Sequence, residues 1–240
     1  MPQSRPVSPT KNSLLESLLK IDYERLSPHL RDVELMQGDV IYSAGDHIDH
    51  VYFPESAVIA LLSTLEDGAT TEVGLIGREG MVGLSVFLGG VATPERAVVQ
   101  VGGKALKMTA SALAKELKVG AALQVALLRY TRSFLALVTQ SVICSQHHLL
   151  EARFARWLLM MQDYSGSDTL YLTHEMVAGM IGTRRAGVSM ATRELRQRGV
   201  ISSERGQIKI LNRGGVEEIA CECYSIIKEE FDSLHKSQIA

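Results

Sequence analysis

Residues 172–188 read LTHEMVAGMIGTRRAGV and decide how the C-terminal third of the chain folds. Thr173 can cap a first helix that begins at His174, because its hydroxyl can accept a hydrogen bond from a backbone N–H of the first turn. Gly182 then allows a sharp turn, and Thr183 can cap a second helix. The stretch predicts two short helices joined by a tight turn. The apolar face of the first helix is Met176, Val177, Met180 and Ile181.

The second helix is expected from Arg184 to about Arg198, and Gly199 stands where a helix commonly stops. Residues 200–203, a turn at 204–206 and residues 207–211 then predict a β-hairpin. Helix, glycine turn, helix and hairpin together are the order of a winged helix-turn-helix. The inner face of the second helix is Val188, Ala191 and Leu195.

Basic residues are concentrated in this region, although the whole chain has a net charge of −2. Between residues 184 and 213 eight basic residues are opposed by two acidic ones, so this segment carries +6 and leaves −8 for the rest of the chain. A basic patch on an otherwise acidic protein indicates a polyanionic partner. The eight basic residues are Arg184, Arg185, Arg193, Arg196, Arg198, Arg205, Lys209 and Arg213.

In a helix-turn-helix the second helix enters the major groove of DNA, and its N-terminal residues meet the base edges. Arg184 and Arg185 stand at that end, where a guanidinium can form two hydrogen bonds with guanine. Arg193 and Arg196 are expected at phosphates or in local pairs with Glu194, and the hairpin tip is suited to a phosphate. A winged helix used for protein contacts is the alternative, but the arginines favour double-stranded DNA. The residues predicted to contact DNA are Thr183, Arg184, Arg185, Gly187, Ser189, Arg193, Arg196, Arg205 and Lys209.

Upstream of this unit, Ser165–Asp168 predicts a short linker. Residues 123–164 contain neither Pro nor Gly, which predicts one long helix. Packing within the chain could use its apolar stripe, but a helix of this length beside a compact domain favours pairing with a second copy. We therefore expect a homodimer held by this helix. The stripe, in steps of three and four, is Leu128, Thr131, Leu135, Val138, Val142, Ser145, Leu149 and Ala152.

Between Val33 and Met108 short apolar runs alternate with turn signals at intervals of about ten residues, which predicts many short strands. The clearest hairpin is expected from residues 97–101 to residues 104–108, with Gly102-Gly103 supplying the positive φ of a tight turn. Strands at this spacing predict a β-sandwich or jelly roll.

The remaining segments and the composition set the broad class. Residues 1–12 are expected to form a loose arm, residues 14–30 one or two short helices, and residues 111–118 another short helix. The chain has 240 residues, of which 46% are hydrophobic and 22% charged, as in an ordinary soluble protein. Its apolar runs are broken by charges short of the roughly 20 residues that a bilayer requires. Because the N-terminus also lacks a secretory signal, a cytoplasmic location is expected.

With these features the sequence resembles the Crp/Fnr family of bacterial transcription regulators over residues 14–220. In the first half the resemblance lies in residues 33–46, VELMQGDVIYSAGD, and residues 51–53, VYF. In the second half it lies in residues 172–188. The order of β-roll, long helix and winged helix-turn-helix is that of the family.

The resemblance implies an α+β fold in three parts: a cyclic-nucleotide-binding-like β-roll sensor at residues 14–118, a dimerisation helix at residues 119–164, and a winged helix-turn-helix DNA-binding domain at residues 165–240. It implies a homodimer on a near-palindromic operator, with RNA polymerase as a further partner. A signal in the β-roll would shift the two recognition helices through the dimer helices.

The expected effector pocket departs from that of family members that bind cyclic AMP. Those members hold the phosphate and ribose with a Gly-Glu pair and a later Arg-Ser or Arg-Thr pair. The corresponding residues here are Gly83-Leu84 and Arg96-Ala97, and the Thr-Ser pair that meets adenine corresponds to Val138-Thr139. Losing the carboxylate and the hydroxyl would cost roughly 2–4 kcal/mol, at about 1–3 kcal/mol each. Cyclic AMP is therefore not the expected ligand.

Two other sensing chemistries can be weighed on the cysteines and histidines. Family members that sense oxygen with an iron–sulfur cluster carry several N-terminal cysteines, whereas no cysteine precedes Cys144 here, so that site cannot be built. Haem or another small molecule remains an alternative effector. The histidines available to haem are His47, His50, His147 and His148, which are otherwise expected in a polar turn and on a helix surface.

The recognition helix departs from the family as well. Members that read the commonest operator use Arg-Glu-x-x-x-Arg, and the matching residues here are Arg185, Ala186 and Met190. A different operator sequence is therefore expected. Gly187 costs up to about 1 kcal/mol in a helix relative to Ala, and it could allow close approach to the DNA backbone.

No enzyme or metal site is expected. The pair His47-x-x-His50 has no third ligand at a strand spacing, and the chain has no phosphate loop, nucleophile elbow or zinc-protease motif. Cys221-x-Cys223 has no second cysteine pair and no histidine near it in the sequence, so these residues and Cys144 are expected to be structural. A sensor that acts only through protein partners is a further alternative, which the arginine-rich helix disfavours.

Overall fold

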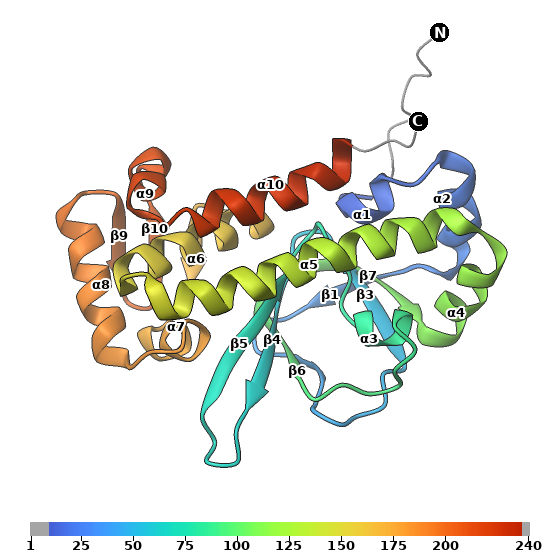
Figure 1. Cartoon of the computed structure of the whole chain (residues 1–240), viewed down its shortest axis with the longest axis horizontal. Coiled ribbons are helices and arrows are strands. Elements are labelled where there is room, and N and C mark those ends of the chain that lie inside the picture. The colour runs from blue at the N-terminus through green and yellow to red at the C-terminus, as the bar shows by residue number, and fades with distance from the viewer. Residues whose placement is uncertain (1–9, 237–240) are drawn as a thin grey trace, which may run out of the picture.

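The computed structural model describes residues 10–236 and has the predicted α+β architecture, with a β-roll followed by helices and a small three-stranded sheet (Figure 1). The β-roll consists of two antiparallel sheets, ordered β1-β7-β3 and β2-β6-β4-β5. Its strands are β1 (Arg31–Leu35), β2 (Val40–Tyr42), β3 (His50–Pro54), β4 (Val58–Thr64), β5 (Thr70–Ile76), β6 (Arg96–Val101) and β7 (Gly103–Thr109).

Strand β4 is buried on both faces, which explains its unbroken apolar run. Ile59 and Leu61 pack inside the β-roll with Val99 of β6. Val58 and Ala60 belong instead to the core that the β-roll shares with the helices. Side chains alternate across a strand, so one continuous apolar sequence serves two cores.

The hairpin predicted at residues 97–108 is wrong. Both strands exist, but β6 pairs with β2 and β4, whereas β7 pairs with β1 and β3. The chain passes from one sheet to the other at Gly102-Gly103, and neither glycine has a positive φ. A Cβ on Gly103 would lie 2.7 Å from the backbone nitrogen of Ala57, so close approach of two chain segments explains this glycine.

Short helices accompany the β-roll, and those within residues 13–29 and 110–119 were predicted, whereas α3 was not. They are α1 (Ser13–Glu16), α2 (Lys20–Leu26), the 3-10 turn η1 (Ser27–His29), α3 (Leu84–Phe87) and α4 (Ala110–Val119). The predicted loose arm is wrong for residues 10–12, and its residues 1–9 lie outside the described part. Asn12 is fully buried, caps α1 and donates to the carbonyl oxygens of Pro54 at 2.8 Å and Gly80 at 3.0 Å.

The single helix predicted from Leu123 to Tyr164 is also wrong. The segment forms two helices, α5 (Ala121–His147) and α6 (Leu150–Ser165). The break lies at His148 and Leu149, which both have extended ψ angles, 144° and 150°. Since neither Pro nor Gly marks the break, it has no local sequence signal.

The C-terminal part contains the predicted winged helix-turn-helix and two further helices. Its sheet has the order β8-β10-β9. Neither α9 nor α10 is among the predicted elements. The elements are β8 (Thr169–Tyr171), α7 (His174–Met180), α8 (Arg185–Gln197), β9 (Ile201–Glu204), β10 (Gln207–Ile210), α9 (Arg213–Ile219) and α10 (Cys223–Lys236).

Helix α10 runs back along α5 toward the β-roll end of the molecule (Figure 1). The Ser133 hydroxyl on α5 donates to the backbone oxygen of Glu230, and Arg132 pairs with the Glu230 carboxylate at 3.0 Å. The Phe231 ring lies 6.4 Å from the rings of both Tyr130 and Tyr164. The last helix thus ties the C-terminal part to α5 and α6.

Three glycines let the large rings of α5 and α6 approach the β-roll closely. A Cβ on Gly74 would lie 2.6 Å from the ring of Phe134, and one on Gly80 would lie 2.4 Å from the Tyr130 hydroxyl. A Cβ on Gly77 would lie 2.5 Å from Cβ of Tyr164. Because a Cβ atom cannot swing away as a side-chain tip can, Gly77 is the least replaceable of the three.

By length and composition alone helix α5 could cross a membrane, although Arg129 and Arg132 interrupt its apolar residues. It packs along α10 and against β5. Its apolar character therefore has a packing explanation on the sides that these elements cover.

Replacing Gly77 with Ala should destabilise the fold by about 1–3 kcal/mol, because overpacking forces the backbone of α6 away from the β-roll. The matched control is Gly179→Ala in α7, where a Cβ would meet nothing within 4 Å. This control should be neutral or stabilising by up to about 1 kcal/mol, because Ala favours helix more than Gly does. Urea unfolding measures both, and equal effects would show that α6 does not constrain Gly77.

Candidate DNA-binding surface and effector region

The two helices of the turn motif begin and end at defined signals. The Thr173 hydroxyl accepts a hydrogen bond from the Met176 N–H, which confirms the predicted cap of α7. Gly182 has a φ of +62°, as the sharp turn requires. Gly199 has a φ of +71° directly after α8, which confirms the predicted stop. The predicted cap at Thr183 is wrong, because Arg184 is the N-cap of α8 and makes no side-chain capping bond.

A groove of about 720 Å³ lies between α8, the start of α7 and the hairpin of β9 and β10. One face of α8 lines it with residues spaced three or four apart, which share a side of a helix. His174 Nδ1 lies 3.0 Å from the Ser189 hydroxyl and links α7 to α8 beside this groove. The α8 residues that line the groove are Arg185, Ser189, Thr192, Arg193 and Arg196, and Arg205 lines it from the hairpin.

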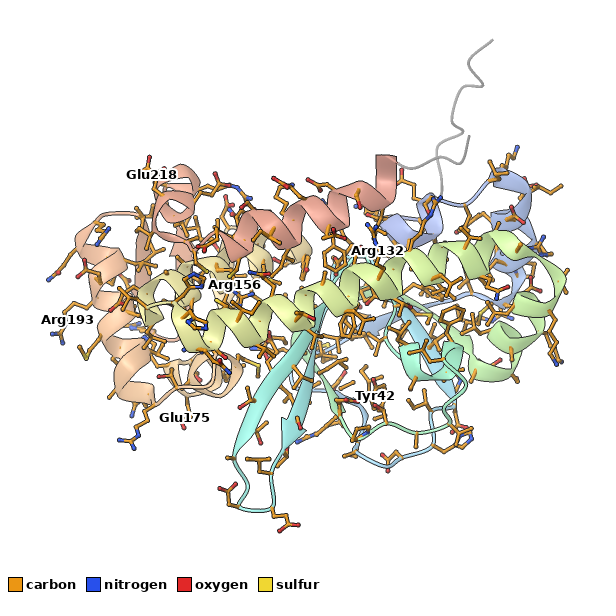
Figure 2. All side chains as sticks on the ribbon, viewed as in Figure 1. Tyr42, Arg132, Arg156, Glu175, Arg193 and Glu218 are labelled. Atoms are coloured by element: carbon orange, nitrogen blue, oxygen red, sulfur yellow. The ribbon has the colours of Figure 1, made fainter. Side chains whose placement is uncertain are left out.

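The basic residues of the patch divide into two groups. Arg198 pairs with Glu194 at 3.0 Å, and Arg213 pairs with Asp163 and Glu217, each at 2.9 Å. Within residues 10–234 no ion pair engages the other six. These six are exposed, and Figure 2 shows Arg193 pointing outward from the end of the molecule distant from the β-roll. The six are Arg184, Arg185, Arg193, Arg196, Arg205 and Lys209.

The hairpin tip places an arginine in an unfavourable backbone conformation. Gln207 is in register with Glu204, so the loop has two residues, Arg205 and Gly206. Their φ values are +46° and +78°, as a type I′ turn requires. Asn or Gly is the usual residue at such a position, and Arg205 is the one non-glycine residue with positive φ in the described part of the chain. An outlier of this kind is typical of a residue kept for function.

Two other predicted contact residues have contacts inside the protein. A Cβ on Gly187 would lie 2.7 Å from Leu150 Cδ2 and 3.0 Å from the Thr183 hydroxyl oxygen, so packing against α6 accounts for this glycine. The Ser189 hydroxyl donates to the Arg185 backbone oxygen in addition to meeting His174. Contact of Gly187 and Ser189 with DNA stays a prediction.

Arg153 stabilises the helix-turn-helix, and this role was not predicted from the sequence. Its guanidinium, on α6, donates to the backbone oxygen of Ile181, the C-cap of α7. The bond satisfies a carbonyl that the helix end leaves without a partner. Proximity to residue 181 has no signature in the sequence, because the two residues lie 28 positions apart.

The first part of the candidate effector pocket lies at the start of α3. Gly83 is the N-cap of α3 with a φ of +92°, and Leu84 is the first helical residue. A hydrogen bond joins the backbone of Gly83 to the Tyr42 hydroxyl, and Tyr42 lies in the β-roll (Figure 2). Burial, with a smaller effect of Glu95, raises the pKa of Tyr42. Within the described residues the Ser85 hydroxyl is buried without a hydrogen-bond partner.

The other predicted pocket residues lie on β6 and α5. Arg96 begins β6 and is exposed, whereas Ala97 is fully buried inside the β-roll. Val138 on α5 packs on the core that α5 shares with the β-roll, and Thr139 is exposed. The predicted pocket residues therefore come from both the β-roll and α5.

A row of apolar side chains on α5 and at the following break is exposed. Leu128, Leu135, Val142 and Leu149 are 53%, 59%, 54% and 79% exposed. They are members of the predicted dimer stripe and recur every seven residues.

The three cysteines gather with one histidine. Cys144 and His148, at the end of α5, lie beside Cys221 and Cys223, which flank the start of α10. The assumption that no histidine lies near Cys221-x-Cys223 is therefore wrong in three dimensions. A hydrogen bond from the Cys221 thiol, aided by the Arg156 guanidinium, lowers the pKa of Cys144 to about 5. Of the other histidines considered for haem, His47 and His50 lie on the β-roll, and His147 is the last residue of α5.

Two family models match the chain and together cover well over half of it. A cyclic nucleotide-binding domain matches residues 32–119, and a Crp-like helix-turn-helix domain matches residues 152–219. A search of curated proteins found no match.

Several solved structures share the fold. FixK2 from Bradyrhizobium japonicum has a TM-score of 0.68 at 17% identity, covering 80% of this chain and 98% of that chain. A CRP-family transcriptional regulator from Thermus thermophilus has a TM-score of 0.67 at 20% identity, covering 78% and 96%. The c-di-GMP-responsive regulator CLP of Xanthomonas campestris has a TM-score of 0.64 at 13% identity, covering 79% and 97%. These identities are low, so the likenesses establish the fold.

Proposed function

The chain belongs to the Crp/Fnr family of transcription regulators, and we propose that it acts as a cytoplasmic homodimer that binds a near-palindromic operator without needing cyclic AMP. The DNA-binding proposal rests on the division of the basic residues into unpaired and ion-paired groups. Within the described residues six of them are exposed and engaged in no ion pair, and four of these six line one groove, whereas Arg198 and Arg213 pair with acidic side chains. No catalytic role is proposed.

Within this surface, Arg184 and Arg185 are proposed to read bases, and Arg193, Arg196, Arg205 and Lys209 to bind phosphates. The N-terminal half of α8 also exposes Ala186 and Met190. Apolar side chains in the major groove contact thymine methyl groups. The operator is therefore proposed to combine a guanine read by Arg185 with neighbouring thymines.

The homodimer is proposed to form along α5. A stripe that repeats every seven residues is the pattern of two helices that wind around each other. Leaving Leu128, Leu135 and Val142 in water forfeits roughly 1.5–3 kcal/mol for each side chain that a partner helix would bury fully. The second copy is the natural occupant because the stripe is self-complementary about a two-fold axis.

The boundaries between the functional parts of the chain are proposed to coincide with the breaks between helices. Residues 14–118 sense the signal, and α5 dimerises. Helix α6 packs on α8 and α9, which favours grouping it with the DNA-binding part rather than with the dimer helix. The boundary is therefore proposed at His148 and Leu149 rather than at Ser165.

The effector is proposed to bind near α3 and to differ from cyclic AMP. Leu84 and Ala97 provide neither the carboxylate nor the hydroxyl that the ribose and phosphate need. The buried Ser85 hydroxyl lacks a partner within the described residues and supplies one polar contact for another ligand. Haem is a second candidate, favoured only by the presence of histidines on the β-roll and α5.

Selection of bound sequences from a random duplex pool tests the proposed function. A two-fold symmetric motif should emerge from the full-length protein without added nucleotide. A motif that appears only with cyclic AMP would refute the interpretation of Leu84 and Ala97. Absence of enrichment with and without the nucleotide would refute DNA binding by the purified protein alone.

Replacing Arg185 with Ala should weaken binding to the selected operator by about 1–3 kcal/mol, or roughly 5- to 150-fold, and relax preference at one base position. Arg198→Ala is the matched control on the same helix, because Glu194 already engages that guanidinium. It should change affinity less than about threefold, apart from nonspecific charge effects. Equal losses in the two variants, measured by fluorescence anisotropy, would argue against base reading by Arg185.

Replacing Leu135 with Glu should shift the protein from dimer to monomer, because two carboxylates would face each other in the apolar seam. Leu19→Glu is the control, since Leu19 is 64% exposed between α1 and α2. Sedimentation equilibrium should give a dimer for the control and a monomer for Leu135→Glu. A monomeric unmodified protein, or a dimeric Leu135→Glu variant, would place the interface elsewhere.

A further inference from the structure

Four potential metal ligands meet where α5 ends and α10 begins. Cys144 and His148 are one helical turn apart, so they project from the same side of α5. Cys221 and Cys223 stand on either side of Glu222, after α9 has ended. The ligand atoms of the four residues all lie within 4.8 Å of one another.

The spacing of these atoms fits one tetrahedral ion. Metal–sulfur bonds of about 2.3 Å and metal–nitrogen bonds of about 2.0 Å set tetrahedral edges of about 3.8 Å between sulfurs and about 3.6 Å between sulfur and nitrogen. Cys144 Sγ lies 3.5 Å from Cys221 Sγ, and Cys223 Sγ lies 3.4 Å from His148 Nδ1. Small movements would bring all four atoms around a common centre.

The surroundings supply what metal ligands usually require. His148 Nε2 lies 3.1 Å from the Glu222 carboxylate, which orients the ring with Nδ1 toward the sulfurs. A carboxylate behind a metal-binding histidine is a recurrent arrangement in zinc sites. The Gln140 side-chain amide donates to Cys223 Sγ at 3.2 Å, as amides do to metal-bound thiolates.

Charge and burial agree with such a site. Cys144 and Cys223 are fully buried and Cys221 is 7% exposed, so uncompensated thiolates would be costly there. Three thiolates around a divalent ion leave one net negative charge. The buried guanidinium of Arg156, which interacts electrostatically with Cys144, offsets that charge (Figure 2).

We propose that Cys144, His148, Cys221 and Cys223 bind one zinc ion per chain, which fastens the end of α5 to the junction of α9 and α10. Three thiolates and an imidazole suit Zn²⁺, and four protein ligands make a closed, structural site. In a [4Fe–4S] cluster each thiolate binds a different iron, so the ligands lie further apart than around a single ion. The compact spacing therefore favours the single ion.

The site lies beside the break between α5 and α6, at His148 and Leu149. The ion would hold the last turn of α5 against the segment that follows the DNA-binding hairpin and α9. Binding displaces protons from the thiols, so its free energy adds to the stability of this junction. This role is independent of the operator and of the effector.

Metal analysis of the full-length protein tests the proposal. Protein purified without chelator should contain about one zinc per chain. After removal of zinc under reducing conditions, Co²⁺ should restore one ion per chain with the absorption bands of tetrahedral thiolate coordination. Zinc below about a tenth of an ion per chain together with no such Co²⁺ spectrum would overturn the proposal. Iron with acid-labile sulfide would overturn the single ion.

Zinc binding by single-residue variants distinguishes the residues that bind the ion from those that only lie near it. His148→Ala should lose the ion or bind it far more weakly, whereas His147→Ala is the matched control, because His147 is adjacent, exposed and outside the cluster. Glu222→Gln should weaken zinc binding roughly 10- to 100-fold while leaving the ligands intact. Equal zinc content in His148→Ala and the unmodified protein would remove His148 from the site.

A thiol count provides an independent readout that does not depend on variant folding. Denatured, metal-free protein prepared without oxygen should show three free thiols. One free thiol would indicate a disulfide between two of the three cysteines and overturn the metal site. The spectrum of the cobalt-loaded unmodified protein likewise keeps the proposal testable where a cysteine variant fails to fold.

Discussion

Burial of α6 on every side is the constraint on which the rest of the structure depends. Its residues from Phe154 to Met161 are all buried, and it touches β4, β8, α8, α9 and α10. Trp157 donates to Glu72 of the β-roll at 3.2 Å, Arg153 holds the end of α7, and Asp163 accepts from Tyr224 of α10 at 2.7 Å. A helix packed at interior density cannot move without moving its neighbours. The position of the recognition helix relative to the β-roll is therefore set by α6 together with the direct contact of α7 with β5.

This arrangement gives a physical route between the β-roll and the helix-turn-helix. Helix α5 contacts the β-roll through Tyr130 and Phe134, and the chain reaches α6 only through the break at His148.

Burial raises the pKa of Glu72 to about 7, since the hydrogen bond from Trp157 offsets only part of the desolvation. Burial likewise raises the pKa of Glu79, which interacts electrostatically with Tyr130 and Tyr164, to about 7. Both carboxyls lie where the β-roll meets the helices, so poorly solvated acids form part of this contact. Between pH 4.5 and about 7 the unfolded chain has lost these protons while the folded chain keeps them, so the folded state loses stability as the pH rises through this range.

Local signals predicted the helix-turn-helix and the short strands of the β-roll, whereas strand pairing, the break after α5 and the cysteine cluster depend on nonlocal contacts and were not predicted. Thr173, Gly182 and Gly199 each act within a few residues, so their roles could be predicted from neighbours alone. The partners of β6 and β7 are strands far away in the sequence, so neighbouring residues do not identify them. The two glycines between β6 and β7 fit a hairpin as well as a crossing between sheets. The break after α5 contains no proline or glycine from which it could be predicted. The cysteine cluster joins residues 77 positions apart, so adjacency in the sequence suggested isolated thiols where the fold makes a group.

The arginines show why the number of basic residues in a sequence overestimates the number that are available to bind a ligand. Eight basic residues define the patch, yet Arg213 is fully engaged in joining α9 to α6 and α10, through Asp163, Glu217 and Tyr224. Arg198 folds back on its own helix. If all six remaining basic residues met phosphates, each chain would neutralise about six of them, and counterion release would make the affinity fall with salt in proportion to that number. Specificity cannot come from that term. We propose that it comes from the few side chains at the start of α8, where Arg185 is kept and Ala186 and Met190 replace the family's other charged residues, so that the same helix reads a changed operator.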